Sequence, residues 1–143
     1  MLFGIWYLRG LHALPITHYA SPINPSFQNW LRMKRKNNII ICKYLPNHIA
    51  AISLFPFILC KNASYAADPI VINHERIHLK QQLELLILLF YLWYGIEFLL
   101  RFAYLKDAQK AYRALSFERE AYTHESDLLY LKTRTCYSFW GKW

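Results

Sequence analysis

Residues 68–82 read DPIVINHERIHLKQQ, and the segment begins with two strong signals for a helix start. Asp68 can accept hydrogen bonds from the free backbone N–H groups of a first helical turn. Pro69 suits the first helical position, where no backbone N–H is needed. The segment therefore predicts a helix that begins at Pro69. This helix is expected to continue through the following apolar run to Leu100, with Gly95 as its only weak interior position.

The predicted helix carries the motif HExxH, formed by His74, Glu75 and His78. Residues i and i+4 share a helix face, so both imidazoles can bind one metal ion. Glu75 is turned about 100° around the helix from His74 and can take a proton from a metal-bound water. The alternative is a helix with two solvent-facing histidines. A zinc site is favoured because the motif follows a strong helix start and precedes a strongly apolar segment.

A third zinc ligand must come from elsewhere in the chain, because catalytic zinc usually has three protein ligands and one position for water. No histidine follows at the spacing HExxHxxGxxH, since position 81 is Gln and position 84 is Glu. Residues 116–125 instead read SFEREAYTHE and offer a carboxylate from a second helix. The candidates in this segment are Glu118, Glu120 and Glu125.

The helical period selects among these three glutamates. Glu118, Ala121, Tyr122 and Glu125 fall on one helix face, whereas Glu120 is turned away from it. The small side chain of Ala121 would let two helices approach closely. Glu118 is therefore the predicted third ligand, and Glu120 is the second choice.

The sequence HERIH at 74–78, followed about forty residues later by FEREA at 117–121, resembles the integral-membrane gluzincins, the CAAX-prenyl-protease and HtpX group. That family takes its third ligand from the Glu of an E-x-x-A-D motif, and Glu118 and Ala121 match its Glu and Ala. Tyr122 departs from the family, whose Asp at this position orients a ligand histidine. Gln81 and Gln82 also resemble the QQ that trails the motif in small bacterial HExxH domains.

The resemblance covers about residues 39–134 and implies a minimal gluzincin-type zinc metallopeptidase acting on a peptide or protein substrate. It implies Zn²⁺ held by His74, His78 and Glu118, with Glu75 as the general base. Two alternatives remain open from the sequence. One is a catalytically inactive zinc-binding module, and the other is a membrane-associated helical interaction protein.

The fold class expected from the sequence is mainly α with a small β-sheet, in which the active-site helix and a glutamate-bearing helix lie beside a short edge sheet. Residues 39–44 are predicted to form one strand and residues 49–60 a second. Pro56 interrupts the second strand, which therefore belongs at a sheet edge or carries a bulge. At a sheet edge, an extended peptide could pair with this strand. Residues 61–67 are predicted to be a loop, and a last helical segment is predicted over residues 107–134 with a break near Ser116.

The 143 residues fit a single domain. Residues 1–36 are interpreted as a peripheral extension or an over-extended gene start, with the metallopeptidase-like domain over residues 37–143. Met33 is then an alternative start to Met1. Three cysteines without a CxxC spacing indicate neither a disulfide framework nor a cysteine zinc site.

The apolar run over residues 83–100 fits either a buried core helix or a transmembrane helix. Its apolar residues surround the helix on all faces, which favours a membrane-associated protein. The formal net charge is +8, but the basic residues are scattered and no nucleic-acid-binding motif accompanies them. No nucleic-acid partner is therefore expected. The sequence leaves a membrane-associated and a cytoplasmic location open.

Overall fold

The computed structural model describes residues 38–141. It is mainly helical with a small three-stranded mixed sheet, which confirms the predicted fold class. The interpretation of residues 1–36 as a peripheral extension lies outside the described residues.

The sheet contains β1 (Ile39–Ile41), β2 (Ala51–Leu54) and β3 (Phe57–Cys60) in the order β1-β3-β2. β1 is parallel to β3, and β2 is antiparallel to it. The prediction of one strand over residues 49–60 is wrong, because these residues form the β2–β3 hairpin. Pro56 lies in its two-residue turn, after a cis peptide bond, where proline removes no hydrogen-bond donor from the sheet.

Two helices follow the sheet, and each begins at a side-chain cap. In α2 (Ala63–Ala67), Asn62 Oδ1 accepts a hydrogen bond from the backbone N of Tyr65 at 3.0 Å. The prediction of a loop over residues 61–67 is therefore wrong, and the missed signal is this asparagine cap. In α3 (Pro69–Glu84), Asp68 Oδ1 accepts from the backbone N of Ile70 at 2.9 Å, which confirms the predicted helix start.

The long helix predicted to run to Leu100 is interrupted between α3 and α4 (Leu88–Leu105). Leu86 and Ile87 have φ angles of 53° and 57°, which an α-helix cannot contain. Ile87 N instead donates to the carbonyl oxygen of Gln82 at 2.6 Å, which closes the turn. Gly95, the expected weak position, lies inside α4 without a break. The chain changes direction here, so α4 can contact the helices that follow it.

The predicted helical segment over residues 107–134 is divided into α5 (Ala108–Ala114), α6 (Ser116–His124) and α7 (Tyr130–Thr133), followed by η1 (Ser138–Gly141). The expected break near Ser116 is confirmed. At this break Glu97 of α4 accepts hydrogen bonds from the backbone N and the Oγ of Ser116, at 2.9 and 2.7 Å. A buried carboxylate thus caps the start of α6 and fixes the helix turn that carries Glu118.

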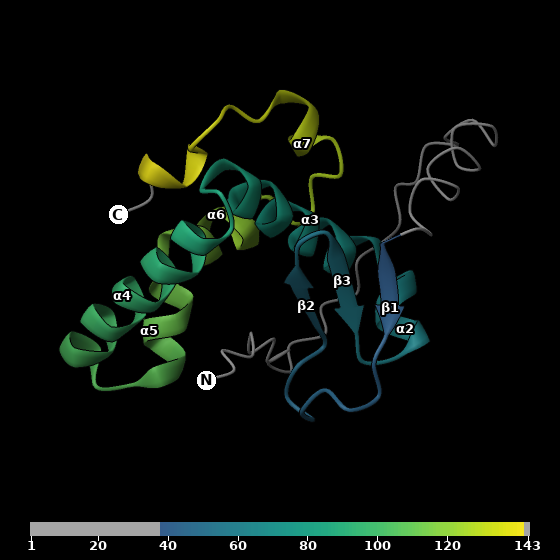
Figure 1. The fold of residues 1–143 in the computed structure, drawn as a ribbon, viewed down its shortest axis with the longest axis horizontal. Coiled ribbons are helices and arrows are strands. Elements are labelled where there is room, and N and C mark those ends of the chain that lie inside the picture. Colours follow the sequence, from purple (N-terminus) through teal and green to yellow (C-terminus); the bar gives the residue numbers. More distant parts are fainter. Residues whose placement is uncertain (1–37, 142–143) are drawn as a thin grey trace, which may run out of the picture.

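Helix α3 lies between two hydrophobic clusters. One joins α3 to the sheet, and its buried members are Ala51, Ile58, Cys60, Val71 and Ile72. The other joins α4, α5, α6 and η1, and its buried members are Phe90, Tyr94, Tyr112, Leu115, Phe117 and Phe139. Figure 1 shows α4 and α5 side by side, extending away from the sheet. The first cluster includes residues of α3, and the second includes a residue of α6. Because α3 also packs against α6, the two clusters fix the facing sides of these helices relative to each other.

Candidate metal centre

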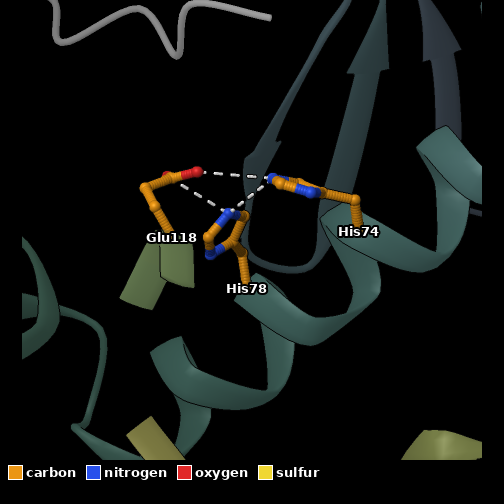
Figure 2. A group of neighbouring side chains, drawn as sticks. All are labelled: His74, His78 and Glu118. Carbon is orange, nitrogen blue, oxygen red and sulfur yellow. Dashed lines mark hydrogen bonds and ion pairs between the residues drawn. The ribbon is translucent and has the colours of Figure 1, made fainter. Parts of the chain in front are cut away.

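The structure brings His74 and His78 of α3 together with Glu118 of α6 (Figure 2). The two histidine Nε2 atoms are 3.1 Å apart. His78 Nε2 lies 3.3 Å from Glu118 Oε1, and His74 Nε2 lies 3.5 Å from Glu118 Oε2. All three side chains are at most 3% exposed. These are the three ligands predicted from the sequence, and they form one buried cluster.

The spacing of the three residues fits a single metal ion. Bonds of about 2.0–2.1 Å at tetrahedral angles place neighbouring zinc ligand atoms about 3.3 Å apart, close to the separations observed here. The donor set of two imidazoles and one carboxylate is one that zinc accepts at catalytic sites. Glu118 Oε2 is buried, and its contact with His74 Nε2 is long for a hydrogen bond, at 3.5 Å. A cation would satisfy this oxygen.

The other ring nitrogen of each histidine has its own partner. His74 Nδ1 lies 2.9 Å from Glu125 Oε2, and His78 Nδ1 lies 2.7 Å from Gln81 Oε1. Both partners accept a hydrogen bond, so each Nδ1 carries a proton and each Nε2 is directed at the cluster, where its lone pair can bind a metal once the Nε2 proton is lost. The sequence offered Glu125 only as a third-ligand candidate. In the structure its carboxylate instead accepts a hydrogen bond from His74 Nδ1, a contact that can hold the orientation of that ring.

Glu120, the second choice for the third ligand, is not in the cluster. Its carboxylate accepts hydrogen bonds from Arg134 Nε, from Tyr130 Oη at 2.9 Å and from Gln81 Nε2 at 3.1 Å. This agrees with the helical period, which turns Glu120 away from Glu118. Gln81 therefore joins His78 to Glu120, and Glu120 joins both to Arg134, whose side chain is 2% exposed.

Tyr94 of α4 is a further residue at the cluster, and no sequence pattern indicated it. Its Oη donates a hydrogen bond to Glu118 Oε1 at 2.9 Å. The contact holds one carboxylate oxygen and leaves Oε2 directed at His74. The Tyr122 ring packs edge-on against the His74 ring, with centroids 4.8 Å apart. These aromatic side chains restrict the positions of the ligands.

Burial and neighbouring charges change the pKa values of the cluster. Burial lowers the pKa of His74, but hydrogen bonds to Glu118 and Glu125 outweigh it and raise that pKa to about 10. Burial raises the pKa of Glu118, but the two histidines outweigh it and hold that pKa below its usual range. Glu118 is therefore an anion paired with cationic imidazoles. A metal cation would replace the imidazole protons, as metal sites of this kind require.

Glu75 lies on α3 beside the cluster and is 3% exposed. Burial raises its pKa above the ordinary value, and His74 and His78 offset part of this increase. Its Oε2 receives no hydrogen bond from any residue in the range 38–141. A buried carboxylate oxygen with no partner, next to three potential ligands, is available to bind a water molecule.

Comparisons with family models, curated proteins and solved structures find no match to this chain. The similarity to gluzincins therefore rests on the sequence motifs.

Replacing Glu125 by Ala is expected to weaken zinc binding about 10- to 100-fold, the usual effect of removing the partner of a ligand histidine. The reason is that His74 Nδ1 loses its acceptor, so the ring is no longer held in one tautomer and orientation. Glu125→Gln keeps an acceptor oxygen and should lose less. Competition titration against a chromophoric chelator measures both affinities. Equal affinity in wild type and Glu125→Ala would contradict the orienting role.

Proposed function

We propose that the protein is a zinc-dependent metallopeptidase of the gluzincin type. The observation that supports this proposal most strongly is the buried cluster of His74, His78 and Glu118, with the unpartnered Oε2 of Glu75 beside it. Three ligands and an adjacent base are the parts that metal-assisted peptide hydrolysis needs.

Each residue has a separate part in the proposed reaction. His74, His78 and Glu118 hold the metal, and zinc bound there supplies a Lewis acid that polarises the peptide carbonyl and acidifies water. Glu75 takes a proton from the attacking water. It then delivers that proton to the amine nitrogen as the peptide C–N bond breaks. Glu125 keeps the His74 ring in the orientation that the metal requires.

A peptide substrate is supported by the position of β2. It is an outer strand of the described sheet and packs against α3, which carries the motif. An extended peptide could therefore add to its free edge. The carbonyl oxygen of Ser53 already accepts a hydrogen bond from Gln82 Nε2 at 3.0 Å. Peptide pairing would then use the part of β2 that precedes Ser53.

Metal removal and replacement test the proposed function directly. Zinc-loaded protein should cleave an unstructured protein such as casein, lose this activity after dialysis against a chelator, and regain it when zinc is returned. The chelator itself must be removed before the assay. Cleavage that persists in verified metal-free protein would contradict the proposal. Zinc binding without cleavage of any peptide tested would favour the inactive zinc-binding alternative.

A further inference from the structure

Helix α4 has one side that nothing in the described structure covers. Its outer face consists of exposed residues that lie on the same side of the helix. These residues are Leu88, Leu89, Leu92, Ile96, Leu99 and Leu100. Leu88 is 80% exposed and Leu99 is 60% exposed. Only 17% of the residues of this 18-residue helix are buried. Such a continuous apolar surface indicates a partner.

The charged residues of α4 lie on the opposite, inner side. Glu97 is buried against Ser116, and Arg101 is ion-paired with Glu97 at 2.7 Å. The outer face of this fully described helix therefore contains no charged residue. An apolar face without charged residues favours contact with hydrocarbon over contact with a charged partner.

Helix α4 is long and apolar enough to cross a bilayer by composition alone. Its packing argues against this arrangement. α5 lies along α4 and exposes Gln109, Lys110 and Arg113. A spanning α4 would carry these side chains into the hydrocarbon core, at a cost of about 2.5–3.5 kcal/mol for each charge at the centre. A helix lying in the plane of the interface keeps them in water.

The exposed charge of the protein favours an anionic surface. Among residues 38–141, seven exposed side chains are basic: Lys43, Lys80, Lys106, Lys110, Arg113, Arg119 and Lys132. Asp127 is the one exposed acidic side chain in the same range. The reason is that four of the nine carboxylates are buried and four more are partly buried. Residues 1–37 add five basic residues and no acidic one to the sequence. A second copy of this chain would present the same positive surface, so like charges would oppose a dimer.

We propose that the outer face of α4 docks on an anionic lipid bilayer, with the helix parallel to the membrane surface. Leucine side chains enter the boundary between headgroups and acyl chains, while basic residues such as Lys106 and Lys110 contact the headgroups. The proposal is independent of metal binding and of peptide cleavage.

Vesicle sedimentation of the full chain tests this docking. Wild type should sediment with vesicles of equimolar phosphatidylcholine and phosphatidylglycerol, and less with phosphatidylcholine alone. The variant Leu92→Gln/Leu99→Gln should bind the mixed vesicles at least about tenfold more weakly, because it lacks two leucines that the bilayer would bury. The matched control is Leu128→Gln/Leu129→Gln, which replaces two exposed leucines outside α4 and should bind like wild type. Circular dichroism checks that each variant is folded.

Four results of the binding and light-scattering measurements would overturn the proposal, and a wash of the vesicles adds a fifth. The first is no binding to the mixed vesicles, and the second is equal binding to both lipid compositions. The third is equal loss in the two double variants. The fourth is a dimer in light scattering that Leu92→Gln/Leu99→Gln dissociates, because the outer face of α4 would then bind a second copy. Vesicle-bound protein should also be released by an alkaline wash, and retention would indicate a spanning helix instead.

Discussion

Replacing Glu75 by Gln is expected to lower the rate of peptide cleavage about 10²- to 10⁴-fold, the range for removal of a general base, with zinc content unchanged. Glutamine has nearly the same size as glutamate but cannot accept the proton of the attacking water. Glu75 is also outside the set of clustered ligand atoms, which come from His74, His78 and Glu118. Initial rates of peptide cleavage and metal content, measured on the same preparations, check both parts of this result.

Lys80→Gln is the matched control for this variant. Lys80 lies on the same helix, is exposed, and also becomes glutamine, so cleavage should stay at the wild-type rate. If Glu75→Gln cleaved peptide at the wild-type rate, Glu75 would not be the general base. Loss of zinc from Glu75→Gln would instead make Glu75 part of the ligand set.

Replacing Arg134 by Met is expected to lower the free energy of unfolding by about 3–5 kcal/mol, the cost of removing one partner from a buried ion pair. Arg134 pairs with both Glu84 and Glu120, and all three side chains are at most 10% exposed. Methionine retains much of the apolar volume but leaves two carboxylates without a counter-ion. Urea denaturation followed by circular dichroism measures the difference.

Two further variants separate this ion pairing from the loss of any surface arginine. Arg119→Met changes an exposed arginine of α6 and should shift the free energy of unfolding by less than about 0.5 kcal/mol. Adding Glu120→Gln to Arg134→Met removes one unpaired charge and should recover part of the loss. An Arg134→Met variant as stable as Arg119→Met would show that the buried network contributes little to stability.

The sequence predicted the parts of the site that depend on local chemistry. Asp68 and Pro69 predicted where α3 begins, and the i, i+4 spacing put His74 and His78 on one face. The same period selected Glu118 over Glu120, and the structure directs these two carboxylates to different partners. Patterns of this kind are visible because they involve residues within one or two helical turns.

The bend between α3 and α4 could not be predicted in this way. Leu86 is a good helix former and Ile87 a moderate one, and the segment has no glycine or proline to mark a break. Their positive φ angles follow from tertiary packing, which places Tyr94 of α4 against Glu118 of α6. The β2–β3 hairpin was missed for a different reason. Pro56 was assigned to the interior of one long strand, whereas it lies in the turn between two strands.

The contacts that Glu125 and Glu120 make were also out of reach, because they join residues far apart in the chain. Glu125 meets His74 across 51 positions, and Glu120 meets Gln81 across 39. No local pattern records such a pairing. The helix face shared by Glu118 and Glu125 was the one available signal, and it does not by itself separate a metal ligand from a residue that orients one.

The most direct measurement of the central claim is the metal content of the purified protein, compared with His78→Ala and Glu118→Ala. The ligand cluster predicts about one zinc ion per wild-type chain, and loss of zinc from both variants while circular dichroism shows that they stay folded. Zinc retained by Glu118→Ala but lost from His78→Ala would remove Glu118 from the ligand set. A wild-type protein that binds no zinc, even after reconstitution, would contradict the metal centre itself.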